Sequence, residues 1–392
     1  MLETDTKLKR ITGHRLCYMF ITLLSAVACR KEDIAYNPVP DTSAPISFST
    51  FIVSSKGLDP IENASLPAKG FGVYAYWVPA GESIGDSYKD NLYINNVKAI
   101  KDGDLWKCSP TCYWPVANDA CFFAYAPYME NPSAGSEDPT ATSLTFPLDS
   151  FSEDGMPKGT FTQTTNVTNQ VDLCLAAPQL NLNSSSGSVP IKLDHALSNL
   201  KFYIRIKGTK KDGTEYKVEE MQISGLIGSN SFSFLRSPAE NGKAFAWDAP
   251  GESTSYDASY LLKDSGTPSH ISTGSWIKYS TEAATTDNST LINDLNNGRL
   301  YLLPQTLTSN AKLTLTLALY KQASGSSTFT KLSSLQPFTI DLPSMEWKPA
   351  QTVSYYLTLD FTNGEYYIDT EITIKMEDWK PSGNNHNEET IE

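Results

Sequence analysis

Apolar and polar residues alternate along much of this 392-residue chain, and this period of two restricts the fold more than any other feature. The alternation is clear over residues 71–77 and 313–319. Near the C-terminus, residues 353–361 alternate, Asn363-Gly364 follows, and residues 368–376 alternate again. Side chains of a strand point alternately to opposite faces, and Asn-Gly is typical of a tight hairpin turn. Because a helical period is almost missing, the pattern predicts an all-β protein.

The distribution of strand and turn signals predicts two domains. Further strands are expected at residues 92–100, 106–114, 121–125 and 171–176. A run of small polar residues at 181–188 has the composition of a linker. We therefore predict two tandem antiparallel β-sandwiches, at residues 46–187 and 188–379, followed by a polar tail at residues 380–392.

The first 28 residues have the composition of a bacterial export signal, with basic residues before an apolar run from Leu16 to Ala28. This run of about 13 residues is shorter than the roughly 20 that a spanning helix needs. Cys29 directly follows small residues, which is where bacterial lipoproteins receive acyl chains such as palmitate. The alternative is an ordinary cleaved signal with an incidental cysteine. We predict that residues 1–28 are a lipoprotein signal peptide, that Cys29 carries lipid, and that residues 29–45 form a flexible spacer.

The chain is acidic, with a formal net charge of -13 at pH 7, and only 19% of its residues are charged. Nucleic-acid binding requires basic patches, so we expect no nucleic acid among the partners. A low charged fraction together with abundant Ser, Thr and Tyr is typical of an extracellular β-protein.

Catalytic motifs are scarce. After the export signal the chain has three histidines, His195, His270 and His386. Asp194-His195 could orient a base, but no nucleophile motif accompanies it, and a structural role is favoured. We therefore predict that the chain is not an enzyme and that it has no catalytic, cofactor-binding or metal-binding residues.

Four cysteines remain beyond Cys29: Cys108, Cys112, Cys121 and Cys174. The Cys108-x3-Cys112 spacing suits a zinc site, but no histidine lies near it in the sequence, and the expected compartment is oxidising. We favour a local disulfide between Cys108 and Cys112. Other pairings remain open, as do buried thiols at Cys121 and Cys174, which lie in apolar segments.

Several phrases follow one another in order across nearly the whole mature chain: Gly70–Tyr76, Trp114–Pro115, Phe122–Tyr128, Leu193–Ser198 and Ile374–Trp379. Together they resemble the fimbrillin family of Bacteroidales, the Mfa-like and type V pilin subunits. The charged Lys31-Glu32-Asp33 after Cys29 also resembles the signal that sends such lipoproteins to the outer face of the outer membrane.

The resemblance implies two transthyretin-like β-sandwich domains, lipoprotein export to the cell surface and assembly into fimbriae. In that family a surface protease with trypsin-like preference cuts after a basic residue behind the first strand. A strand of the next subunit then fills the groove that the first strand leaves, which is a form of β-augmentation.

Carried over to this chain, the resemblance makes residues 46–53 the leader strand and Lys56 or Lys69 the processing site. Many relatives have arginine there, so an uncut subunit that keeps its lipid anchor is the alternative. The donor strand would be residues 368–376, or it would be absent. Stalk, tip and anchor roles remain open.

We therefore expect a structural subunit of a cell-surface fimbria that supports adhesion. Its partners would be other fimbrial subunits, the outer membrane through the lipid, and a host or bacterial surface ligand. The alternative is a surface lipoprotein that does not polymerise and binds a glycan or host ligand. The many tyrosines and tryptophans fit either function, although core packing is the commoner role of aromatic residues in strands.

Overall fold

The computed structural model describes residues 38–52, 65–130, 142–211, 213–251, 254–264, 271, 276–293, 300–361 and 369–378. The chain divides into two units at residue 37, and all that follows concerns the second unit, residues 38–392. The predicted export signal, Cys29, Lys56 and the tail at 380–392 lie outside the described residues. Strands dominate the described part, which confirms the prediction of an all-β protein.

Helical structure in the described ranges is limited to four short segments. They are α2 (Leu66–Lys69) and the 3-10 turns η1 (Asp86–Tyr88), η2 (Val167–Asn169) and η3 (Ser184–Ser186). A membrane-crossing helix would need to be longer and more apolar than any helix in these ranges.

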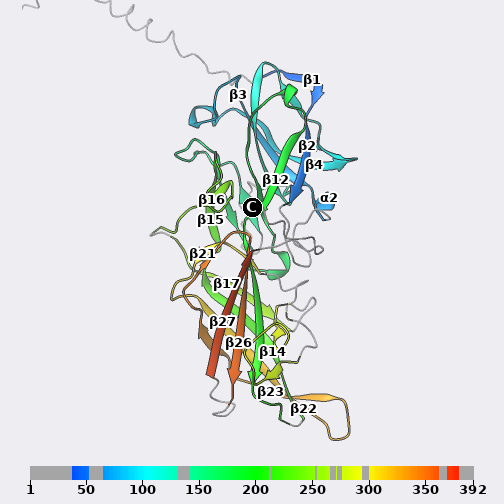
Figure 1. Cartoon of the computed structure of the whole chain (residues 1–392), viewed down its shortest axis with the longest axis vertical. Coiled ribbons are helices and arrows are strands. Elements are labelled where there is room, and N and C mark those ends of the chain that lie inside the picture. The colour runs from blue at the N-terminus through cyan, green and yellow to red at the C-terminus, as the bar shows by residue number, and fades with distance from the viewer. Residues whose placement is uncertain are drawn as a thin grey trace, which may run out of the picture. The chain divides into compact units, whose positions relative to one another are not determined.

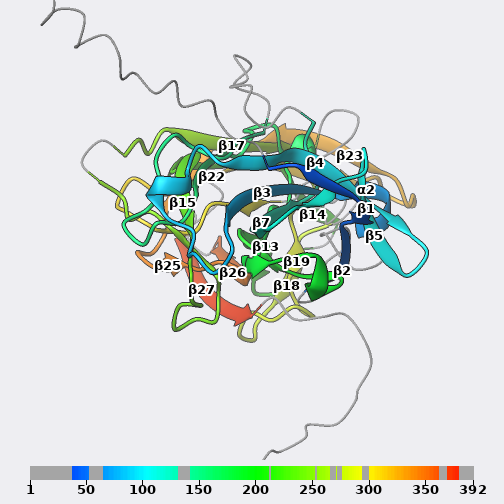
Figure 2. The same ribbon diagram turned by 90° about the horizontal axis from the view of Figure 1, so that it is seen from above.

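The largest sheet is built mainly from the N-terminal half of the chain. Its order is β10-β12-β2-β5-β4-β3-β7-β11, and β10 also pairs with β7, so the strands from β10 to β7 form a closed ring. Figure 2 shows β4, β3 and β7 in succession. The strands are β2 (Ser47–Ile52), β3 (Phe71–Pro79), β4 (Leu92–Asp102), β5 (Leu105–Ser109), β7 (Asn118–Ala126), β10 (Cys174–Ala176), β11 (Gln179–Leu182) and β12 (Val189–His195).

The strand β3 is buried on both faces, which explains its continuous apolar sequence. Phe71, Val73 and Ala75 belong to the hydrophobic cluster of the ring, together with residues of β2, β5, β7 and β12. Tyr74 and Tyr76 point the other way, into a second cluster. The predicted face of alternate residues is therefore present, and the residues between them are buried as well.

The second cluster is covered by a four-stranded sheet of order β16-β15-β9-β8. Its strands are β8 (Ser143–Thr145), β9 (Lys158–Thr162), β15 (Ser229–Phe234) and β16 (Phe245–Trp247). Both β15 and β16 follow residue 187 in the sequence, as does β12 of the ring. Strand pairing thus crosses the boundary that we placed between residues 187 and 188, and that boundary stays a prediction.

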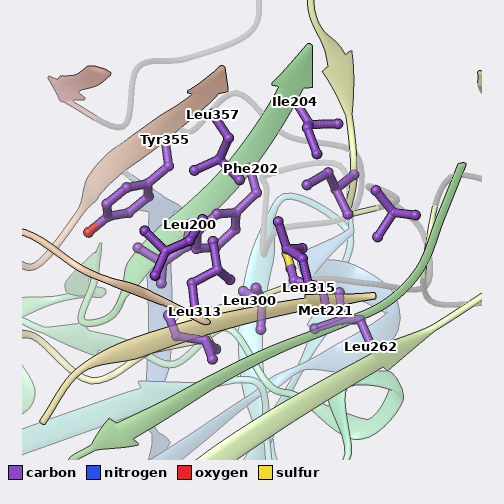
Figure 3. Packing of buried hydrophobic residues seen from close by; sticks show 14 of the residues in the cluster. Leu200, Phe202, Ile204, Met221, Leu262, Leu300, Leu313, Leu315, Tyr355 and Leu357 are labelled. Carbon is purple, nitrogen blue, oxygen red and sulfur yellow. The ribbon is translucent and has the colours of Figure 1, made fainter. Parts of the chain in front are cut away.

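Two further sheets enclose a third hydrophobic cluster in the C-terminal half. One has the order β18-β13-β26-β27, with β19 and β20 also on β13, and the other has the order β17-β14-β22-β23, with β24 also on β22. In Figure 3 Phe202 of β13 and Tyr355 of β26 lie side by side, and their rings stack 4.9 Å apart. The strands are β13 (Ser198–Lys207), β14 (Thr214–Leu226), β17 (Ala258–Lys263), β18 (Lys278–Ser280), β19 (Thr290–Leu291), β20 (Tyr301–Leu302), β22 (Lys312–Gln322), β23 (Phe329–Ser334), β24 (Phe338–Asp341), β26 (Gln351–Asp360) and β27 (Asp369–Asp378).

Not all pairing is antiparallel, contrary to the prediction. β12 runs parallel to β2, and β13 runs parallel to both β26 and β18. Hairpins produce antiparallel neighbours, whereas each of these pairs joins segments that are far apart in the sequence. An alternation pattern does not indicate which distant strand will be the neighbour.

Two predicted segments differ locally from the structure. Residues 40–45, expected in the spacer, form β1 (Pro40–Pro45), which pairs irregularly with β6 (Tyr113–Pro115). Proline is tolerated there because a short edge pair uses few backbone N–H groups. The strand expected over 106–114 is split into β5 and β6. The remaining short pair joins β21 (Gln305–Thr306) to β25 (Glu346–Trp347).

Candidate assembly site

The strand β2 is an inner strand of the ring. It lies between β12 and β5, and Figure 1 shows β2 in blue beside β12 in green. The pairing with β12 runs from Phe48 opposite Val189 to Ile52 opposite Leu193, whereas β5 pairs only with Ser47 and Phe48. Most backbone pairing of β2 is therefore with one parallel neighbour.

The side chain of Phe48 anchors β2 in the interior of the ring. It is fully buried, and its ring packs edge-on against Phe71 at 5.7 Å and against Phe122 at 6.0 Å between centroids. Ile46, just before the strand, is also buried, whereas Ser49 is exposed. The predicted alternation of the leader strand is confirmed at these positions.

The start of β2 is fixed by a backbone contact with the segment between β5 and β6. The N–H of Ile46 donates a hydrogen bond to the carbonyl oxygen of Cys112 at 2.9 Å. The side chains of Cys108 and Cys112 are hydrogen-bonded to each other, and both cysteines are thiols in the structure. The hydrogen bond to Cys108 lowers the pKa of the Cys112 thiol, so Cys112 is the more reactive of the two.

Lys69 is the last residue of α2, and Gly70 separates it from β3. It is partly exposed, but the next residue, Gly70, is buried. Gly70 donates its N–H to the carbonyl of Leu66 at 2.7 Å and accepts from the N–H of Tyr128 at 3.1 Å. The bond between Lys69 and Gly70 therefore lies in ordered backbone. The other candidate, Lys56, lies in the part of the chain that is not described.

None of the described side chains of the last described strand, β27, is fully buried. It pairs with β26 through ten residue pairs, from Asp369 opposite Asp360 to Asp378 opposite Gln351. In the described ranges it is an edge strand of its sheet. Its apolar residues are poorly buried: Ile372 and Ile374 are half-buried, and Met376 is 54% exposed. The apolar side chains of β27 are therefore less buried than Phe48 of β2.

Comparison with known proteins agrees with this architecture. The profile of the family described as fimbrillin-like matches residues 67–379. The chain belongs to the fimbrillin-like family. The family resemblance found in the sequence is thereby confirmed.

Individual relatives share the length of the chain. The fimbrium subunit Fim1C of Phocaeicola vulgatus is 25% identical over 383 residues, which covers 92% of this chain and 95% of the relative. A solved fimbrial protein of Bacteroides vulgatus is 20% identical, with a TM-score of 0.59 over 85% of this chain and 99% of that one. A cell adhesion protein from Bacteroides uniformis gives a TM-score of 0.42, at 15% identity, over 86% of this chain and 99% of the other. The structural similarity to the Bacteroides vulgatus protein shows that the two proteins share a fold.

This fimbrillin-like chain also has a polar cluster that the sequence did not predict. Asp172, Cys174 and His195 are all buried, and their side-chain atoms lie within 4.8 Å of one another. His195 Nδ1 lies 3.0 Å from Asp172 Oδ1 and 3.5 Å from Cys174 Sγ. The sequence gives no sign of this cluster, because Cys174 and His195 are far apart in the chain and meet only through the pairing of β10 with β12.

The cluster has the residue types of a thiol enzyme but not the exposure. Burial, first of all, raises the pKa of the Cys174 thiol well above its usual value. A fully buried, protonated thiol is inert as a nucleophile. The neighbouring Asp194 points elsewhere and forms an ion pair with Lys243 at 3.0 Å. The geometry therefore favours a structural role for Asp172, Cys174 and His195, as expected for a family of fimbrial subunits.

Proposed function

We propose that this chain is a structural subunit of a cell-surface fimbria, exported as a lipoprotein and assembled by strand exchange after its first strand has been removed. In this account β2 is a leader that occupies a groove between β12 and β5 until export is complete. The N-terminal and C-terminal halves of the chain would each have the transthyretin-like sandwich form of the family. The observation that carries the proposal is the place of β2, an inner strand that precedes the part of the chain matched by the family profile.

Removal of β2 would leave a groove with defined chemistry. The exposed edges of β12 and β5 would offer unpaired backbone groups, and the space vacated by Phe48 would be lined by Phe71 and Phe122. An unpaired edge above an apolar channel is a strong template for an added strand. The occupant that the proposal assigns is a strand of another subunit, with alternate apolar side chains that replace Ile46 and Phe48.

The donor that the proposal assigns is β27. Its apolar residues alternate, and they are only partly buried in its own domain, so transfer to a deeper groove would increase their burial. Burial of apolar surface contributes about 25 cal/mol per Å². The ten pairs with β26 oppose this transfer.

In this proposal, removal of the leader also removes the lipid. Cys29 lies ahead of β2, so cleavage after Lys56 or Lys69 would release the lipid together with the leader. A subunit that is not cut would instead stay anchored in the outer membrane through Cys29. Labelling cells with a palmitate analogue tests the anchor, because Cys29→Ala should abolish the label while Cys112→Ala should keep it.

Limited digestion of the purified precursor with trypsin tests the assembly step. We expect one clip behind β2, loss of the leader and a ladder of polymers that resist denaturing detergent. Lys56→Ala and Lys69→Ala identify the site, and Lys89→Ala, an exposed lysine beside η1, is the control. A precursor that is clipped but stays monomeric, with its leader still bound, would contradict the proposal and favour a surface lipoprotein that does not polymerise.

A further inference from the structure

The buried cluster of Asp172, Cys174 and His195 brings a carboxylate, a sulfur and an imidazole nitrogen close together. Two partners converge on one ring nitrogen: Asp172 Oδ1 lies 3.0 Å and Cys174 Sγ lies 3.5 Å from His195 Nδ1. An imidazole nitrogen has one in-plane position, which holds either a hydrogen or a lone pair. A single N–H would have to be shared between the carboxylate and the sulfur. A cation between the three atoms would satisfy all of them at once.

The spacing of the three atoms suits a tetrahedral zinc ion. Zinc lies about 2.0–2.1 Å from histidine nitrogen and about 2.3 Å from cysteine sulfur, which places neighbouring ligand atoms roughly 3.3–3.6 Å apart. The distance from nitrogen to sulfur, 3.5 Å, falls within this range. The distance from nitrogen to oxygen, 3.0 Å, would lengthen by about 0.3 Å on binding. Because the two oxygens of one carboxylate are too close together to fill two corners of a tetrahedron, the fourth position would be left to a water molecule.

The charges balance as well. All three residues are buried, with relative exposures of 5% for Asp172, 0% for Cys174 and 1% for His195. A divalent cation bound by one thiolate, one carboxylate and one neutral imidazole is a neutral group, the only kind that such a site holds without a large desolvation cost. The combination of sulfur, imidazole and carboxylate ligands favours zinc over magnesium or calcium, which prefer oxygen alone.

We propose that Asp172, Cys174 and His195 form a structural zinc site. Binding would release the thiol proton of Cys174 and any proton on His195 Nδ1 to solvent, with no change of oxidation state. The ion would join β10 to β12 at the pair Cys174 and His195, in addition to the backbone ladder. It would thereby stiffen β12, the strand that carries most of the pairing to β2. This inference does not depend on cleavage or polymerisation.

The metal content of the full chain, purified without chelators, tests the proposal. We expect one zinc per chain by elemental analysis, and its loss in both Cys174→Ser and His195→Ala. Cys121→Ser is the matched control, because Cys121 is also a fully buried thiol of the same sheet but bonds with Asn181 instead. That variant should keep its zinc.

Cobalt substitution provides a second, spectroscopic test that uses the wild-type chain. Refolding wild-type chain with Co²⁺ should produce the strong near-ultraviolet band of a thiolate bound to cobalt, together with the intense visible bands of tetrahedral coordination. A folded wild-type chain with no zinc and no cobalt bands would overturn the proposal. So would zinc that persists in Cys174→Ser, since the ion would then lie elsewhere.

Discussion

The backbone N–H of Ile46 donates to the carbonyl oxygen of Cys112, and this 2.9 Å bond fixes the start of β2 to the segment that joins β5 to β6. The strand β2 is thus held at one end by a local bond and along its length by the parallel ladder to β12. Its main apolar anchor is Phe48. The release of β2 that we propose would have to break these contacts.

Replacing Phe48 with alanine should loosen β2. Loss of a fully buried phenylalanine typically costs about 3–5 kcal/mol. We expect Phe48→Ala to lower the free energy of unfolding of the full chain by this amount and to speed amide hydrogen exchange in β2. Ser49→Ala, at an exposed position of the same strand, is the control and should change the free energy by less than about 0.5 kcal/mol. Equal effects of the two substitutions would contradict the assigned role of Phe48.

Cys108 and Cys112 should form a disulfide when the chain meets an oxidised disulfide reagent. The two thiols give up two protons and two electrons, and the reagent is reduced to its thiols. Because the pKa of Cys112 is lowered, its thiolate should attack first. Mass spectrometry of a digest would show the bridge, and Cys121 and Cys174 should remain unmodified because both are buried. A pairing that involves either of these two would show the prediction to be wrong.

Gly225 should tolerate no side chain. Its φ is +74°, and an added Cβ would lie 1.9 Å from the carbonyl oxygen of Asn310. Gly242 is a matched control, since its φ is +73° but nothing lies within 4 Å of the added atom. We expect Gly242→Ala to cost about 1 kcal/mol from backbone strain alone, and Gly225→Ala to cost several times more. Denaturant unfolding of both variants measures the difference, and equal costs would contradict the close approach.

The stability of the chain should fall in mildly alkaline solution. Burial raises the pKa of the Cys121 thiol to about 11, whereas an unfolded cysteine has a pKa of about 8.5. A group whose pKa is raised by folding stabilises the native state below the unfolded pKa, and this contribution is lost as the pH rises toward the folded pKa. Between pH 9 and 11 we expect a loss of about 1.4 kcal/mol per pH unit from this thiol.

The control for the alkaline effect is Cys121→Ala, which should reduce the slope of unfolding free energy against pH. Buried tyrosines such as Tyr260 also have raised pKa values through burial, so part of the slope will remain above pH 10. An unchanged slope in Cys121→Ala would show that this thiol is not responsible.

The strand content and the buried positions Ile46 and Phe48 could be predicted from the sequence because both depend on local patterns. Ile46 and Phe48 alternate with polar residues, and this alternation is visible without knowing their neighbours. The partners of β2 were not predictable in this way: Val189 lies far from Phe48 in the chain, and a parallel ladder leaves no mark in the pattern. His195 is the sharpest example. Its sequence neighbour Asp194 was the candidate partner, whereas its spatial neighbours Asp172 and Cys174 come from an earlier segment.

Strand pairing across residue 187 was missed for a similar reason. The polar run at 181–188 has the composition of a linker, yet it contains η3, capped by the side chain of Asn183. Composition indicates where the chain turns, but not to which sheet the next strand returns. The strand β15 returns to β9, which precedes this run.

The most direct test of the central claim is the intact mass and N-terminal sequence of this subunit recovered from surface fibres. The account predicts a chain that begins at Gly57 or Gly70, without β2 and without lipid, joined to its neighbours by a detergent-resistant contact. Fibres built from subunits that keep residues 46–52 and a lipidated Cys29 throughout would contradict it.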